Sequence, residues 1–155
     1  MHDRTKSQLR NELATKYPSC GRPVSVNLDS YELLLSFIPM KDEPDVTPIN
    51  NLALDKNLPI AVPAKEPGTY IFLNTAEKGK TIIVQSIKVK TLMLVPGVAF
   101  TQDGKRLGRG GGWYDRALTN LPKCIETVGI CAKERLLSDL PTEEHDRKVS
   151  KVLIV

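Results

Sequence analysis

Residues 91–118 read TLMLVPGVAFTQDGKRLGRGGGWYDRAL, and this stretch decides the fold. Its first five residues, TLMLV, form a short apolar run that predicts a buried strand ended by Pro96 and Gly97. Residues 114–121, which follow a loop rich in glycine, predict a helix. A buried strand that leads through a glycine-rich loop into a helix indicates a layered α/β fold.

The loop between this strand and this helix has the composition of a phosphate-binding site. It holds five glycines, at positions 104, 108, 110, 111 and 112. A backbone without side chains can approach phosphate oxygens closely, and the helix N-terminus beyond it offers free amide donors. Arg106 and Arg109 add forked cationic donors. Asp115, expected in the first helical turn, is placed to hold a magnesium ion against the same phosphates.

Two common phosphate motifs do not fit this loop. No Lys-Ser or Lys-Thr pair follows the glycines, which excludes GxxxxGK[ST]. A dinucleotide GxGxxG read from Gly108 would need glycine at position 113, where Trp113 stands. From the residues alone, a purely structural turn and an RGG-like RNA contact both remain open.

The rest of the chain alternates between helical and strand-like patterns. Leu9, Leu13 and Tyr17 recur at four-residue spacing and predict a helix over residues 5–16, closed by Pro18. A second helix is expected over residues 47–57, with Thr47 as its cap. Further strands are expected at residues 31–38, 60–62, 69–74, 81–86, 126–132 and 152–155, of which 69–74 and 81–86 form a hairpin. This alternation favours a largely parallel sheet.

Composition limits the class of protein. The chain has 155 residues, 41% hydrophobic and 26% charged, which is typical of one soluble globular domain. No apolar run is long enough to cross a bilayer. Three cysteines without CxxC spacing argue against disulfides and zinc and fit a reducing cytoplasm. The net charge of +4 fits either a mildly basic protein or a site for a polyanion.

Residues 96–118 resemble the signature of the 5-formyltetrahydrofolate cyclo-ligase family, approximately P-G-hydrophobic-A-F-x-x-x-G-x-R-L-G-R-G-x-G-aromatic-Y-D. The resemblance extends along most of the chain. It implies a three-layer, Rossmann-like sandwich with a largely parallel central sheet, in one compact domain over residues 1–155. It also implies ATP- and Mg²⁺-dependent cyclisation of 5-formyltetrahydrofolate to 5,10-methenyltetrahydrofolate through a phosphorylated formyl oxygen, with release of ADP and phosphate. A cytoplasmic monomer without membrane or nucleic-acid partners is expected.

The resemblance also assigns roles to residues. Lys6 and Arg10, which alone would read as a solvated basic face, become clamps for ATP phosphates, and Arg109, Asp115 and Lys6 become catalytic. The implied ATP contacts are Lys6, Arg10, Arg106, Gly108, Arg109, Gly110, Gly111, Gly112, Trp113 and Tyr114. The implied folate contacts are Ile38, Glu43, Arg109, Gly110 and Trp113, and the implied metal ligands are Asp115 and Asp146. Without the resemblance, Glu43 reads as part of an exposed acidic turn, and His145 as an exposed loop histidine.

The chain departs from the family pattern in several places. The region between the first helix and Tyr31 is short, so we expect a helix there to be reduced or absent. Residues 68–90 lack the usual proline-containing substrate segment, and Ala64, Thr91 and Ser150 replace commoner residues. Two other functions stay open: a non-catalytic relative that binds a nucleotide, a folate or RNA, and an enzyme such as a sugar-phosphate isomerase on a related scaffold. An aromatic content of 5% is poor for base stacking.

Overall fold

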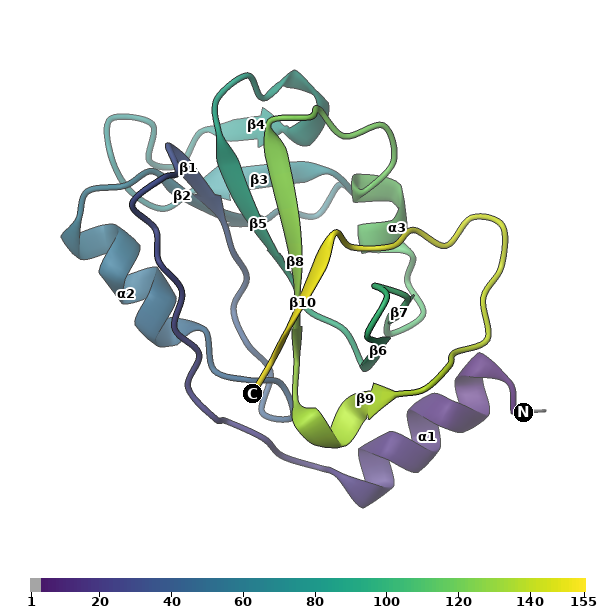
Figure 1. The fold of residues 1–155 in the computed structure, drawn as a ribbon. Coiled ribbons are helices and arrows are strands. Elements are labelled where there is room, and N and C mark those ends of the chain that lie inside the picture. Colours follow the sequence, from purple (N-terminus) through teal and green to yellow (C-terminus); the bar gives the residue numbers. More distant parts are fainter. Residues whose placement is uncertain (1–3) are drawn as a thin grey trace.

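The fold is built around a seven-stranded sheet, seen in a computed structural model that describes residues 4–155 (Figure 1). The strands follow the order β10-β8-β5-β1-β2-β3-β4. Their bounds are β1 Leu33–Leu35, β2 Ile60–Pro63, β3 Thr69–Phe72, β4 Thr81–Ile83, β5 Thr91–Val95, β8 Ile125–Cys131 and β10 Lys151–Ile154. The five strands from β10 to β2 run parallel, and β3 and β4 add an antiparallel hairpin at one edge. The predicted fold class, α/β with a largely parallel sheet, is confirmed.

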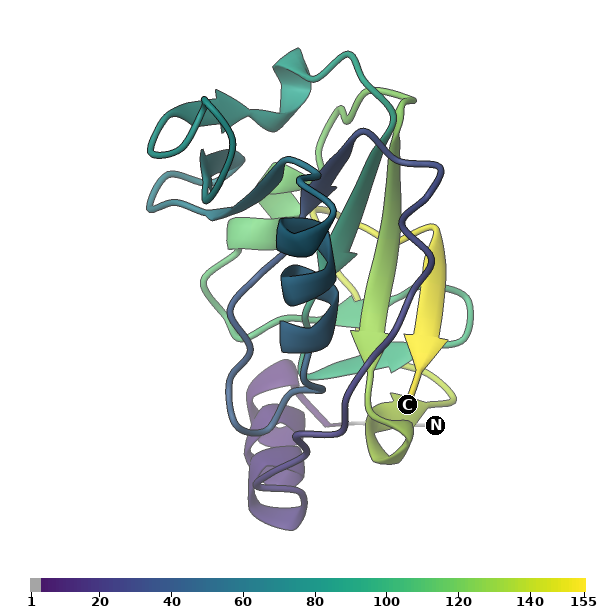
Figure 2. The same cartoon turned by 90° about the vertical axis from the view of Figure 1, so that its left-hand side faces the viewer.

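The remaining elements cover the two faces of this sheet. They are the helices α1 Lys6–Lys16, α2 Thr47–Asp55 and α3 Trp113–Ala117, the 3₁₀ turns η1 Val84–Ser86 and η2 Lys133–Arg135, and a small sheet of β6 Ala99–Thr101, β7 Arg106–Leu107 and β9 Leu136–Leu137. In Figure 1, α2 and α3 lie on opposite sides of the central strands. Figure 2 shows the extended segment 18–30 running beside β8 and β10. This extended chain occupies the region where a reduced or absent helix was expected.

Two buried clusters, one on each face, hold the layers together. Successive side chains of a strand point to opposite faces, so Leu34 packs into the cluster under α2 while Leu33 and Leu35 pack into the cluster under α3. In β5 every residue is buried, as the apolar run TLMLV predicted. A parallel strand covered on both faces is expected to be apolar throughout.

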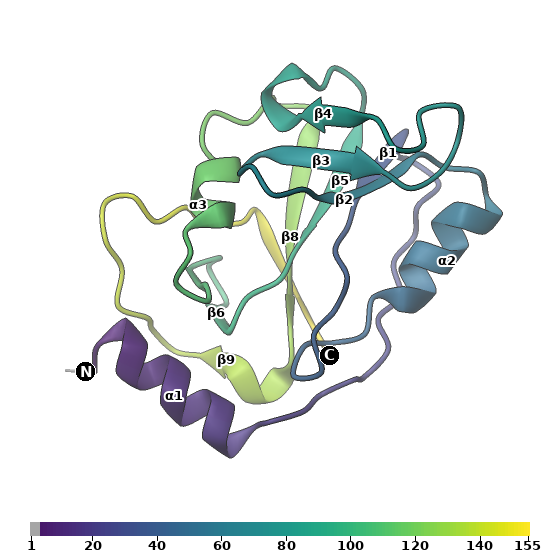
Figure 3. The same cartoon turned by 180° about the vertical axis from the view of Figure 1, so that it is seen from behind.

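Helix α1 begins with a capping box and packs on the small sheet. Thr5 Oγ1 accepts from the backbone N–H of Gln8, and the Gln8 side chain accepts from the Thr5 N–H. Leu9 and Leu13 are buried in a cluster with residues of β6 and β7. Seen from behind, α1 lies below the small sheet and α3 above it (Figure 3). This packing places the polar face of α1 beside the glycine loop.

Several helix ends and short strands differ from the sequence prediction. Thr47 is not the cap of α2 but its first helical residue; Val46 holds the cap position and Asp45 Oδ1 accepts from the Thr47 N–H at 3.0 Å. Helix α3 ends at Ala117 because Asn120 adopts a left-handed φ of 55° before Pro122. Three strands of two or three residues, β6, β7 and β9, were missed, since runs this short carry no periodicity. Among the described residues, no helix is long and apolar enough to cross a membrane.

The chain reverses its direction of growth across the sheet between β1 and β5. From β1 it proceeds through α2 to β2 on one side, and from β5 it proceeds to β8 and β10 on the other side. The carboxyl ends of β1 and β5 therefore diverge and leave a crevice between the loops that follow them. Ligands of open α/β sheets bind in such crevices.

Gly104 joins the turn after β6 to the segment before β10. Its surroundings indicate that a side chain at this position would strongly destabilise the fold. Its φ is +94°, and a Cβ placed on it would collide with the backbone oxygen of Val149, whose N–H donates to Gly104 O at 3.0 Å. We expect Gly104→Ala to lower the free energy of unfolding by about 3 kcal/mol or more. Urea denaturation measures the loss.

Gly79→Ala is the matched control for this substitution. Gly79 has a φ of +83° but nothing within 4 Å of the added Cβ. Gly79→Ala should therefore lower the free energy of unfolding only by the cost of a left-handed backbone at alanine, about 1 kcal/mol. Equal losses in the two variants would contradict the steric argument.

Candidate functional site

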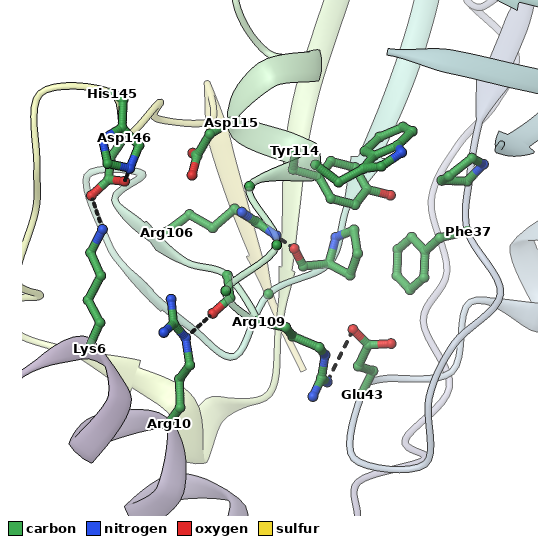
Figure 4. Close-up of a pocket in the computed structure, with 18 of the residues that line it drawn as sticks. Lys6, Arg10, Phe37, Glu43, Arg106, Arg109, Tyr114, Asp115, His145 and Asp146 are labelled. Atoms are coloured by element: carbon green, nitrogen blue, oxygen red, sulfur yellow. Dashed lines mark hydrogen bonds and ion pairs between the residues drawn. The ribbon is translucent and has the colours of Figure 1, made fainter. Parts of the chain in front are cut away.

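A cavity of about 910 Å³ opens at the carboxyl ends of β1 and β5 (Figure 4). Its walls come from α1, the turn after β1, the glycine loop and the segment before β10. Every residue to which the sequence assigned a role lines it: Lys6, Arg10, Ile38, Glu43, Arg106, Gly108, Arg109, Gly110, Gly111, Gly112, Trp113, Tyr114, Asp115 and Asp146. The fold thus brings together residues that lie up to 140 positions apart in the chain.

The glycine loop forms one wall together with α1. Arg10 Nε donates to Gly108 O at 2.6 Å, which ties the helix to the loop. Gly110 and Gly112 adopt φ values of 111° and 72°, and Gly112 is the cap residue of α3. These left-handed conformations favour glycine. Asp115 lies in the first turn of α3, as predicted.

Arg106 lies beneath the loop. Its Nε donates to Pro96 O at 2.7 Å, and its guanidinium stands 5.0 Å from the centre of the Tyr114 ring. A Cβ on Gly108 would meet Arg106 Nη1 at 2.8 Å, so a larger residue there would displace the Arg106 guanidinium. Burial lowers the pKa of Arg106, although Asp115 partly opposes this. The geometry gives Arg106 a supporting position under the loop, and its predicted phosphate contact stays a prediction.

One end of the cavity gathers carboxylates around a lysine. Lys6 Nζ lies 2.6 Å from Asp146 Oδ2 and 3.0 Å from Glu143 Oε1. Burial alone lowers the pKa of Lys6, but the hydrogen bonds and charges of Asp146 and Glu143 outweigh it and raise that pKa. Burial alone raises the pKa of Asp146, but the bonds from Lys6 and the Glu143 N–H lower it overall. Both groups are therefore charged at neutral pH.

The same end can hold a divalent cation. Asp115, His145 and Asp146 each offer one ligand atom, and these atoms lie within 4.8 Å of one another. Two carboxylates suit Mg²⁺, which prefers oxygen ligands and completes its shell with water and phosphate oxygens. Asp115 Oδ1 also accepts from the Arg147 N–H at 3.1 Å, which orients it. His145 has a side chain 66% exposed, as expected of a loop histidine.

The opposite end of the cavity is apolar around a buried carboxylate. Glu43 is only 5% exposed, so the alternative of an exposed acidic turn is wrong for this residue. Its Oε1 accepts from the Met40 N–H at 2.7 Å, and Oε2 lies 3.4 Å from Arg109 Nη2. Ile38 is 68% exposed at the mouth, and Figure 4 shows Phe37 beside Glu43. A planar ring that carries N–H donors would fit this end.

Trp113 both lines the cavity and packs into the fold. Its Nε1 donates to Ala64 O at 3.1 Å, and its ring meets Tyr70 and Tyr114 edge to face at 5.5 and 4.7 Å. Trp113 is therefore both a wall of the cavity and part of the packing around the core. It is also the single tryptophan of the sequence, so its fluorescence reports on this cavity.

Arg109 connects the two ends. From the glycine loop it reaches across the mouth, where Nη2 donates to Asp42 Oδ1 at 2.8 Å beside Glu43. Burial lowers the pKa of Arg109, but Asp42 and Glu43 raise it overall. Sequence reasoning missed Asp42, although it stands next to Glu43. It also missed Arg135, which bonds Asp42 from below and carries no motif.

Burial of tyrosines predicts a pH effect on stability. Burial and a hydrogen bond to Glu126 raise the pKa of Tyr31 to about 12, and burial also raises the pKa values of Tyr70 and Tyr114. The unfolded chain releases these protons near pH 10, so it binds fewer protons than the folded chain above that pH. Folding stability should therefore be intact below pH 10 and fall between pH 10 and 12.

Absorbance at 295 nm tests this effect. The folded protein should ionise fewer of its four tyrosines at pH 11 than the protein unfolded in urea. Tyr31→Phe should remove part of the difference. Identical titration curves for the folded and unfolded protein would contradict the burial argument.

Both the sequence and the fold resemble those of known proteins. A sequence model of the 5-formyltetrahydrofolate cyclo-ligase family matches residues 26–155. The 5-formyltetrahydrofolate cyclo-ligase of Mus musculus is 41% identical over 69 residues, which cover 40% of this chain and 32% of that protein. The 5-formyltetrahydrofolate cyclo-ligase of Mycolicibacterium smegmatis is 35% identical over 69 residues, which cover 44% of this chain and 36% of that protein. The matched chain spans about a third of the length of these curated relatives.

Solved structures resemble the whole fold. A 5,10-methenyltetrahydrofolate synthetase from Mycoplasma pneumoniae superposes with a TM-score of 0.71 at 19% identity, covering 96% of this chain and 98% of that one. An NMR structure of the synthetase from Aquifex aeolicus gives 0.67 at 22% identity, with 96% and 89% covered. At these identities the likeness speaks for the fold, and it agrees with a mixed α/β domain around a mostly parallel sheet.

Proposed function

Because the chain belongs to the 5-formyltetrahydrofolate cyclo-ligase family, we propose that it converts 5-formyltetrahydrofolate to 5,10-methenyltetrahydrofolate at the expense of ATP. One observation carries the proposal: a glycine-rich end that holds Lys6, Arg10 and the carboxylates of Asp115 and Asp146, and an apolar end around Glu43, share one cavity. ATP phosphates fit the first end, and the donor-bearing ring of the folate fits the second end against Glu43.

The reaction needs a better leaving group than an amide-like oxygen. In the proposed sequence the formyl oxygen attacks the terminal phosphorus of ATP, and the bond to ADP breaks. The second folate nitrogen then attacks the formyl carbon and loses its proton, and the carbon–oxygen bond breaks to release phosphate. The protein's task is positioning and charge neutralisation at the transferring group.

Each side chain has a place in this task. Lys6 and Arg10 hold phosphate oxygens from α1, and the N–H groups of Gly110 to Gly112 donate from the loop. Arg109, which lies between the two ends, neutralises charge on the transferring phosphoryl group. Asp115 and Asp146 would hold Mg²⁺, which when bound neutralises phosphate charge and orients the oxygens. Glu43 orients the folate ring.

A spectroscopic assay tests the proposed function. Purified protein, Mg-ATP and 5-formyltetrahydrofolate under reducing conditions should produce the methenyl chromophore in the near ultraviolet. ADP, or ATP with excess chelator, should give no signal. If folded protein gives no ATP-dependent signal, the proposed cyclo-ligase activity is wrong.

The same preparation separates the alternatives. Quenching of Trp113 fluorescence by ATP or folate without turnover would identify a binding protein that has kept the cavity. RNA binding that weakens steeply with salt would identify a surface that follows phosphates. Turnover of a sugar phosphate without ATP would identify an isomerase.

We also propose a cytoplasmic location, which the three free cysteines support.

A further inference from the structure

Arg135 is a buried arginine that the proposed reaction does not use directly. It is the last residue of η2, and its side chain is only 4% exposed. Nη1 donates to Val98 O at 3.1 Å, and Nη2 faces Tyr17 O at 2.7 Å and Leu13 O at 3.4 Å. Carbonyls from the C-terminal end of α1 and from the chain just before β6 therefore fix this guanidinium.

The charge of Arg135 is balanced by the carboxylate that holds Arg109. Arg135 Nη2 lies 3.2 Å from Asp42 Oδ2, and Arg109 Nη2 lies 2.8 Å from Asp42 Oδ1. One carboxylate thus bridges two guanidiniums. The first is buried, and the second is 38% exposed at the cavity. An unpaired buried charge is costly, so Asp42 is bound to Arg135 more firmly than to a surface partner.

Arg109 needs an anchor outside its own loop. It stands between Gly108 and Gly110, and Gly110 adopts a left-handed φ of 111°. Glycine neighbours offer no side chains to pack against, and fixing a free arginine side chain costs about 2 kcal/mol of rotamer entropy. Figure 4 shows Arg109 leaving the loop and pointing toward Glu43. Its direction is therefore set from the far side of the cavity, by Asp42 and Glu43.

We propose that Arg135 is a positioning residue that sets the direction of Arg109 through Asp42. We call this chain of two ion pairs the relay: buried Arg135 holds Asp42, and Asp42 holds the Arg109 guanidinium that faces the cavity. The relay keeps the Arg109 guanidinium between the phosphate end and the Glu43 end before the substrates arrive. The role of Arg109 in turnover rests on the proposed function, whereas the relay itself does not.

A kinetic cycle tests the relay. Arg135→Lys keeps the positive charge, but one ammonium cannot serve three carbonyls and Asp42 together. Asp42→Asn leaves the Arg135 side chain and its carbonyl bonds in place. We expect each variant to lower kcat about 100-fold, the cost of a reacting group misplaced by about 1 Å. KM for ATP should stay close to the wild-type value, because Lys6 and Arg10 are untouched.

Two comparisons separate positioning from a structural role. In an Arg109→Ala background, Arg135→Lys should add less than about a twofold loss, because the group that it positions is already gone. Arg22→Lys is the matched control: Arg22 forms a forked ion pair with Glu134, the neighbour of Arg135, outside the cavity. It should leave kcat unchanged. Full additivity, or an equal loss in Arg22→Lys, would overturn the relay.

A second readout does not depend on turnover. The Nε–H resonance of Arg109, assigned with Arg109→Lys in ¹⁵N-labelled protein, should be sharp in the wild type and broadened or averaged in Arg135→Lys and Asp42→Asn. An unchanged resonance in both variants would overturn the relay. If the wild type makes no methenyl product but the resonance responds as expected, the proposed function fails and the relay stands.

Discussion

Asp115→Asn should lower kcat about 1,000-fold, or about 4 kcal/mol of transition-state stabilisation. Asp115, in the first turn of α3, meets Asp146 and His145 at the end of the cavity where we propose that phosphate binds. The amide keeps the shape of the side chain but removes the charge that a divalent cation needs beside transferring phosphate. Its oxygen can still accept from the Arg147 N–H, as Asp115 Oδ1 does at 3.1 Å, so the fold should persist.

The control for Asp115→Asn is Asp139→Asn. Asp139 is an exposed carboxylate outside the cavity, 2.8 Å from Lys105 Nζ. An exposed pair of this kind contributes about 0 to 1 kcal/mol, so kcat should not change. Binding of Mn²⁺ in the presence of ATP, followed by electron paramagnetic resonance, should weaken in Asp115→Asn and not in the control. A wild-type kcat in Asp115→Asn would remove this residue from the reaction.

The parts of the fold that were predicted are those with a strong local pattern. Residues 91–95 were predicted to the residue as β5, because a run of buried apolar residues ends there at Pro96 and Gly97. The helix over residues 5–16 differs from α1 by one residue, since Thr5 caps it. Thr47 was misread because a threonine before a proline suits both the cap and the first helical turn. Here Asp45 provides the side-chain contact to that turn.

Residues that line the cavity could be predicted as a set, but their arrangement could not. The glycines and Asp115 are close in sequence, so their composition favoured a phosphate site, while a structural turn and an RGG-like RNA contact stayed open from the residues alone. The burial of Glu43 depends on the turn that folds it back onto the Met40 N–H, and no residue pattern announces that turn. Arg135 was invisible because three of its four acceptors are backbone carbonyls, which any residue supplies.

Arg109→Ala should lower kcat about 1,000-fold. The KM for either substrate should change much less. An arginine that neutralises a transferring phosphoryl group contributes about 10³-fold or more to the rate. Arg109 is the cation that spans the cavity from the glycine loop to Asp42 and Glu43, between the two ends where the substrates would meet. Its loss removes the charge where it develops in the reaction, whereas Lys6 and Arg10 still hold the ground-state phosphates.

The comparison of Arg109→Ala with Arg109→Lys decides whether charge alone is enough. Lysine restores a positive charge but not the planar guanidinium, whose Nη2 contacts both Asp42 and Glu43 and whose shape keeps further N–H donors in fixed directions. It should therefore recover only part of the lost rate. Arg22→Ala, which removes an arginine outside the cavity, should keep the wild-type kcat. If Arg109→Ala raised KM and left kcat intact, Arg109 would be a binding residue, because uniform binding affects the ground state and the transition state alike.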